Sequence, residues 1–184
     1  MYSLSPLSVN ARGGKTATLL NGKDRVHGIL QLDILFPPGN FERDPTAARQ
    51  NITARVTPAI DTFFTDLDNW AIPYITEHSE RLLGKQMTKY EVRFGYTSCI
   101  KRPDGKEPML KLKINMPTSK APCRCWSQEG AEVPFIEDWA GISVKGKVML
   151  SNLWVMGTGP KAEFGIVCVL TDAMQLSQPF AFPF

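Results

Sequence analysis

The chain has 184 residues, of which 43% are apolar and 21% are charged, and its formal net charge is +3. This length is enough for one domain with its own hydrophobic core, and the apolar fraction excludes a wholly disordered chain. No apolar run reaches the roughly 18 residues of a membrane-spanning helix, so we expect no membrane association. Four cysteines do not form a disulfide scaffold in a chain of this length, and the first residues lack the pattern of a secretory signal. These features predict an intracellular protein with free thiols that is not secreted.

The first half of the chain is predicted to contain an arm, a strand and a helix. Residues 1–25 are rich in Ser, Gly, Asn and Lys without a clear period, which indicates an N-terminal arm or loop. Residues 26–36 are typical of a strand, and the two prolines that follow should end it. We expect residues 40–56, which are mostly polar, to form a loop with at most one helical turn.

Local signals mark both ends of a helical segment at about residues 57–84. Thr57 is a suitable N-cap, and Pro58 suits the first helical position. Apolar residues then recur at spacings of three and four, which predicts a helix with one buried face. Pro73 should kink or split this helix because it lacks a backbone N–H, and Gly84 supplies a helix-ending residue.

The second half is predicted to be rich in strands. Residues 90–100 and 109–115 flank the turn sequence Pro103-Asp104-Gly105, which predicts a β-hairpin. Residues 117–141 should form a long irregular connection.

Two more strands, at residues 142–156 and 163–170, bring the total to five. Five strands with one helical insertion indicate a mainly β protein and a small five-stranded β-barrel. The domain would span residues 26–175, and the tail at 176–184 contains two prolines and should hold no regular element.

The positive charge is concentrated in one part of the chain. Residues 85–125 contain ten basic and three acidic side chains, a net charge of +7, whereas the remaining residues carry a net charge of −4. This asymmetry favours a polyanion-binding surface, although a lysine-rich face that serves only solubility fits it equally well.

Strand alternation predicts where these cations point. In each of three predicted strands the apolar residues share one face and the basic residues share the other. If the three strands are neighbours, their cations form one positively charged sheet face that suits a nucleic-acid backbone. The predicted phosphate contacts are Arg93, Lys101, Arg102, Lys111, Lys113, Lys145 and Lys147, and Arg124 is a further predicted nucleic-acid contact.

A protein that binds single strands also needs flat side chains on which bases stack. Trp126, beside Arg124, is the first candidate, and core or loop packing is the competing interpretation. Trp154 is a candidate if a bulge turns it outward. Tyr96 is a further candidate, although alternation places it with the core row.

Sequence patterns for catalysis or metal binding are missing. The segment from Gly13 to Thr16 resembles the end of a phosphate-binding loop, but Val9 stands where the motif requires glycine. Cys123 and Cys125 have the wrong spacing for a zinc knuckle. We therefore expect no enzymatic activity, no metal and no cofactor.

Several of these segments resemble the OB-fold single-stranded DNA-binding proteins encoded by phages and large DNA viruses. The likeness covers about half of the chain and rests on Phe94-Gly95-Tyr96, the basic segment 108–114, the strands at 144–156 and 164–170, and the Pro-Phe ending. It implies an OB-like barrel that binds single-stranded DNA with little sequence preference in DNA replication, recombination or repair.

The resemblance also implies a mobile C-terminal tail that contacts replication proteins or covers the binding groove. The candidate contacts there are Phe180, Phe182 and Phe184. Two features depart from the family pattern. The tail contains no acid, and the predicted helix follows the first strand instead of the third.

Two alternatives remain open at this stage. The chain could be a viral structural or assembly protein whose Phe-rich tail docks into a neighbour, or an RNA-binding protein on the same barrel. The sequence leaves open both the choice between DNA and RNA and the question of a homo-oligomer.

Overall fold

The computed structural model describes residues 1–11, 13–40 and 44–176. The chain divides into two compact units. We call the first the helical unit, which comprises Met1–Val26, Thr57–Cys99 and Leu150–Val167. The barrel unit comprises the described residues of His27–Val56, Ile100–Met149 and Cys168–Phe184.

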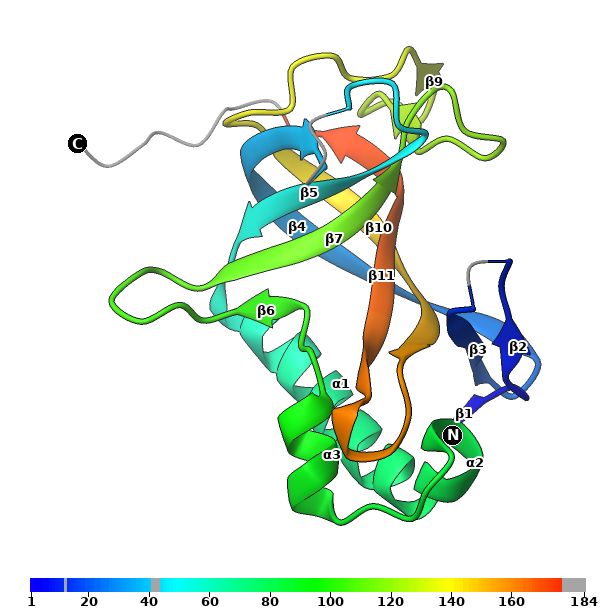
Figure 1. Cartoon of the computed structure of the whole chain (residues 1–184). Coiled ribbons are helices and arrows are strands. Elements are labelled where there is room, and N and C mark those ends of the chain that lie inside the picture. Colours follow the sequence, from blue (N-terminus) through cyan, green and yellow to red (C-terminus); the bar gives the residue numbers. More distant parts are fainter. Residues whose placement is uncertain (12, 41–43, 177–184) are drawn as a thin grey trace. The chain divides into compact units, whose positions relative to one another are not determined.

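Five strands form a closed ring that defines the barrel unit (Figure 1). The ring order is β10, β4, β5, β7 and β11, and pairing of β11 with β10 closes it. Pairing is antiparallel between β4 and β5 and between β5 and β7, and parallel between β7 and β11. The protein is thus mainly β with an OB-like barrel, as predicted. The strands are β4 (Asp24–Gly39), β5 (Arg49–Arg55), β7 (Met109–Asn115), β10 (Ser143–Met156) and β11 (Glu163–Gln175).

The interior of the ring is built by the alternation expected for half-buried strands. Leu110, Leu112 and Ile114 of β7 are all buried, and the lysines between them lie on the outer face. β5 contributes Ile52 and Ala54 to the same core. Truncation of one such leucine to alanine typically costs about 2–5 kcal/mol, so this row fixes which face of each strand reaches solvent.

Short strands also pair with two strands of the ring, β7 and β11. β6 (Ile100–Lys101) pairs with the start of β7 across a turn in which the Lys106 N–H donates to the Pro103 carbonyl. Gly105 has a φ of +68°, so the expected hairpin is confirmed, but its first arm is only two residues long. β8 (Arg124–Trp126) pairs in parallel with β11, and β9 (Glu132–Val133) pairs with β8.

The helical unit contains three strands where an arm was expected. They are β1 (Tyr2–Leu4), β2 (Ser8–Val9) and β3 (Lys15–Asn21). β3 pairs with the second half of β10, opposite Leu153 and its neighbours. Ala17 and Leu19 of β3 are buried, and their alternation is masked in the sequence by the polar residues around them.

The main helix, α1 (Pro58–Glu77), begins as predicted. Thr57 accepts a hydrogen bond from the Ile60 N–H, and Pro58 stands in the first turn. The expected division at Pro73 is absent, since α1 continues to Glu77 and α2 (Ser79–Leu83) follows. Burial of the apolar face on both sides of Pro73 compensates for the one missing hydrogen bond. Gly84 ends α2 with a φ of +78°, as predicted.

The predicted strand at residues 90–100 is wrong. Residues Lys89–Gly95 form the helix α3, which begins with a capping box between Thr88 and Glu91. Only Val92 of its apolar side chains is buried, so the alternation that suggested a strand has no buried face behind it. A one-turn helix, η1 (Gly159–Lys161), lies near α3 in the same unit.

The prediction of a loop at residues 40–56 is also wrong, because β5 lies there and supplies the fifth strand of the ring. β4 continues through Pro37 and Pro38, where its register with β5 is irregular. The connection at residues 117–141 contains β8 and β9. No helix in the described part of the chain is long and apolar enough to cross a membrane.

Candidate nucleic-acid interface

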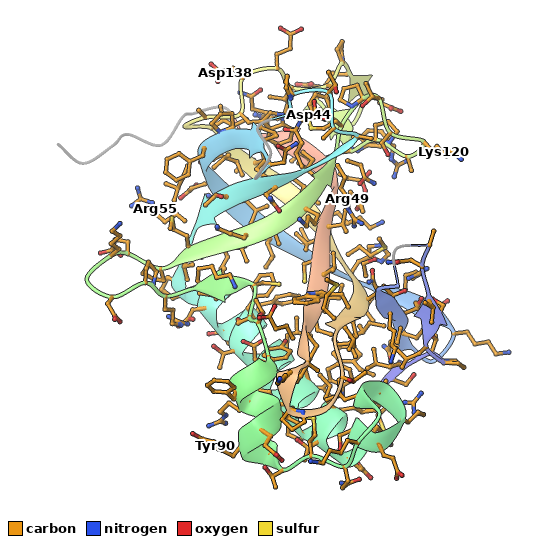
Figure 2. The ribbon with its side chains drawn as sticks, viewed as in Figure 1. Asp44, Arg49, Arg55, Tyr90, Lys120 and Asp138 are labelled. Atoms are coloured by element: carbon orange, nitrogen blue, oxygen red, sulfur yellow. The ribbon has the colours of Figure 1, made fainter. Side chains whose placement is uncertain are left out.

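The outer face of the β5–β7 ladder carries positive charge. Arg49 lies opposite Asn115, Asn51 opposite Lys113, and Thr53 opposite Lys111. Because β5 and β7 turn their apolar rows inward, all of these side chains project from the barrel. Figure 2 labels Arg49 and Arg55 at the two ends of β5.

Lys113 lies close to two other cations of this face, Arg49 and Lys111. Its Nζ donates a hydrogen bond to Asn51 Oδ1 at 2.6 Å. Burial, followed by repulsion from Arg49 and Lys111, lowers the pKa of Lys113, and burial likewise lowers the pKa of Arg49. A phosphate bound at this position would relieve the repulsion among the three cations, since it supplies the missing negative charge.

A second pair of outward cations stands on β10. Lys145 and Lys147 flank Gly146, which faces the core. A Cβ atom at Gly146 would lie 2.7 Å from Leu170 Cδ1 and 2.9 Å from Leu32 Cδ1, so close packing inside the barrel favours glycine there. This packing fixes the direction in which the two lysines leave the strand.

Trp126 on β8 is held in place by an acid on β11. Its Nε1–H donates to Asp172 Oδ1 at 3.1 Å, and Arg124 Nη2 lies 2.7 Å from the same oxygen. The Arg124 guanidinium also lies over the Trp126 ring, 5.2 Å from its centroid. The indole is partly exposed, and these contacts hold it in one orientation. Asp172 also offsets much of the charge of Arg124.

These elements enclose two grooves on the outer surface of the barrel unit. The first, which we call the Trp126 groove, has a volume of about 370 Å³ and places Trp126 beside Lys145 and Lys147, with Ile29 at its wall. The second, the Arg49 groove, measures about 460 Å³ and includes Arg49 and Arg124. Both grooves are lined in part by Asp172 on β11.

The structure brings together only part of the predicted site. Trp126, Lys145 and Lys147 line one groove, whereas Lys111 and Lys113 project from β7. The strands that carry these cations were expected to be neighbours, but in the ring β11 lies between β7 and β10. Lys101 on β6 and Arg102 in the turn that follows also belong to the barrel unit.

Three predicted residues belong to the helical unit instead. Arg93 is exposed on α3, and Tyr96 is the C-cap of that helix, where its Oη donates to Asp68 Oδ1 at 2.8 Å. Trp154 lies on β10 opposite Thr16 and is partly exposed. None of these three lines the Trp126 groove. Phe180, Phe182 and Phe184 lie outside the described residues.

Sequence reasoning missed Arg49, Asn51 and Ile29. The first two lie in a segment that was expected to be a loop, and its alternation of Gln50, Ile52 and Ala54 was the signal that could have found them. Ile29 was predicted to lie in a strand but was not predicted to contribute to a binding surface, and it is 59% exposed on β4.

The described residues contain no group of three or more His, Cys, Asp or Glu side chains that could hold a metal ion. Cys123 and Cys125 are buried free thiols. A hydrogen bond from the Cys123 thiol lowers the pKa of Cys125 to about 7 and raises that of Cys123. This pair is a hydrogen-bonded part of the β8 region and not a ligand cluster.

No protein-family model matches the chain, and no curated protein matches it. Among solved structures, it is similar to the single-stranded DNA-binding protein from bacteriophage Enc34 in complex with single-stranded DNA. That comparison has 11% identity and a TM-score of 0.48, and covers 97% of this chain and 96% of the other. The same phage protein alone gives 10% identity and a TM-score of 0.47, covering 98% and 94% of the two chains. A C-terminal truncation of the phage protein gives 11% identity and a TM-score of 0.47, covering 97% of this chain and 95% of the other. These structural neighbours belong to the class of protein that the sequence resembles.

Proposed function

We propose that this protein binds single-stranded DNA with little sequence preference and without enzymatic activity, through the outer surface of the barrel unit. The observation that carries the proposal is the Trp126 groove, in which a partly exposed indole lies beside two outward lysines.

The groove offers the two interactions that an unpaired strand needs. Lysines neutralise phosphates and release counterions, which supplies most of the affinity. An indole stacks on any base, since every base has a π-face, and each such stack is worth roughly 1–3 kcal/mol. A duplex keeps its bases stacked inside the helix, so the same groove favours a single strand.

The cluster of Arg49, Lys111 and Lys113 supports the same ligand. Burial, followed by repulsion from Arg49 and Lys111, lowers the pKa of Lys113, and Asn51 supplies a neutral oxygen and no negative charge. Within the described residues, none of these three cations forms an ion pair. A chain of phosphates that follows the outer face from β10 across β11 to β7 would offset this repulsion.

We further propose roles in replication, recombination or repair inside the cell, with contacts to replication proteins through Phe180, Phe182 and Phe184. The DNA contacts would include Lys101, Arg102 and Arg124. We also propose that the protein associates into a homo-oligomer. No cofactor is proposed.

A titration of fluorescently labelled oligothymidine, followed by anisotropy at rising salt, tests the main proposal. We expect binding that weakens as the salt concentration rises. Unlabelled single strands should displace the labelled oligothymidine, whereas a duplex of equal length should displace it poorly. Lack of binding, or equal competition by the duplex, would reject it. Stronger competition by RNA of equal length would transfer the function to RNA.

A further inference from the structure

Two large aromatic side chains stand in solvent on α3. Tyr90 is 79% exposed and Phe94 is 83% exposed. They are four residues apart, so they lie on the same side of the helix. Tyr90 projects from α3 in Figure 2. Adjacent exposed aromatics mark a surface used for binding more often than single exposed apolar side chains do.

The backbone beneath these rings is held firmly. The capping box between Thr88 and Glu91 begins the helix, and Val92 on the opposite face is fully buried. A Cβ atom at Gly95 would lie 2.6 Å from the Ala162 carbonyl oxygen, so this side of α3 packs closely on its neighbour. The aromatic face is therefore presented in one orientation.

The surroundings of the two rings are cationic. Lys85, Lys89 and Arg93 are exposed, and none of them forms an ion pair within the described part of the chain. Glu91, the acid within α3, already accepts hydrogen bonds from the Thr88 N–H and Oγ1, at 2.7 and 2.8 Å. Those bonds, and to a smaller extent the charge of Lys85, lower the pKa of Glu91, and the three cations with this one acid keep a net positive charge.

We propose that this surface, formed by Tyr90, Phe94, Lys85, Lys89 and Arg93, is a second contact site for single-stranded DNA. The inference rests on the proposed function and extends the footprint to the helical unit. Aromatic residues and arginine are common at protein–protein interfaces too, but lysine is depleted there and is a common phosphate contact, so the two lysines favour DNA over a protein partner.

The spacing of the rings agrees with an unpaired strand. The Cβ atoms of residues four apart on a helix are about 5–6 Å from each other. Bases in a duplex strand follow one another at about 3.4 Å. Two adjacent bases that are drawn apart in a single strand can therefore each stack on one ring, with their phosphates toward the cations.

The test compares Tyr90→Ala/Phe94→Ala with Val9→Ala/Met156→Ala, which removes two other exposed apolar side chains of the helical unit. For an oligothymidine of about 30 nucleotides we expect the first variant to bind about tenfold more weakly, or worse, and the second to bind like the wild type. Thermal unfolding should be unchanged in both, because none of the four side chains is buried.

Photo-crosslinking to an oligonucleotide that contains 5-iodouracil provides the direct readout. Crosslinks mapped to Tyr90 or Phe94 support the inference. Unchanged affinity of Tyr90→Ala/Phe94→Ala with crosslinks at Trp126 alone overturns it and leaves the proposed function intact. A wild-type chain that binds no oligonucleotide rejects both.

Discussion

Neutralising Lys145 and Lys147 should reduce the salt dependence of single-stranded DNA binding by a defined amount. Five outward cations of the barrel unit form no ion pair with any described residue: Arg49, Lys111, Lys113, Lys145 and Lys147. Each phosphate contact to a single strand contributes about −0.7 to the slope of log K against log salt. Five contacts give a slope of about −3.5, and the Lys145→Gln/Lys147→Gln variant should give about −2.1.

The difference is large enough to measure. Between about 50 and 200 mM salt, the wild type should lose affinity about 130-fold and the variant about 20-fold. The difference of about 1.4 between the two slopes holds even if further cations contribute to both proteins. Fluorescence anisotropy with a short labelled oligothymidine at four or more salt concentrations provides both slopes.

The matched control is Lys23→Gln/Lys120→Gln, which lowers the net charge equally at two exposed positions outside both grooves. Its slope should equal that of the wild type. If the control and the groove variant change the slope by the same amount, the long-range charge of the protein and not the Trp126 groove governs binding, and the proposed site is refuted.

Three further predictions concern single residues. Trp126→Ala should weaken binding about tenfold and Trp126→Phe less, because phenylalanine keeps a stacking ring but loses the bond to Asp172; equal losses in titrations would argue against stacking. Lys113→Met should weaken binding while leaving the melting temperature at neutral pH unchanged or higher. In the folded wild type the pKa of Lys113 is lowered from 10.5, so between the folded and unfolded pKa values the unfolded chain binds more protons. The free energy of unfolding should therefore rise as pH increases through the range between these two pKa values. Melting curves at increasing pH should show this rise in the wild type and a smaller one in the variant. Gly146→Ala should destabilise the fold by about 1–3 kcal/mol in denaturant titrations, because the new methyl group meets Leu170; unchanged stability would contradict the close packing seen there.

Local signals predicted the elements whose determinants lie within the element or directly beside it in the sequence. The helix begins at Pro58 because Thr57 satisfies a backbone N–H and proline needs no such bond. β7 has the predicted bounds because its apolar and basic residues alternate strictly. Gly105 turns the chain with a positive φ, as the sequence required.

The same local patterns failed where burial did not follow them. Alternating Val92, Phe94 and Tyr96 predicted a strand, yet Phe94 is exposed and the segment is helical. The capping box of Thr88 and Glu91 was the competing signal, and its two hydrogen bonds decide the start of α3. At β5 the buried row begins with Gln50, which is 4% exposed, and this polar residue concealed a strand.

By itself, the sequence determined the mainly β class, the concentration of charge and the identity of Trp126, Lys145 and Lys147 as candidate contacts. Only the tertiary structure decided that these three side chains share a groove, because their meeting depends on parallel pairing of β8 with β11 and on Asp172 holding Trp126. It also assigned Arg93 and Tyr96 to a different unit. Alternation along a strand fixes only the face on which a side chain lies, whereas its neighbours across the sheet are set by pairings between residues far apart in the chain.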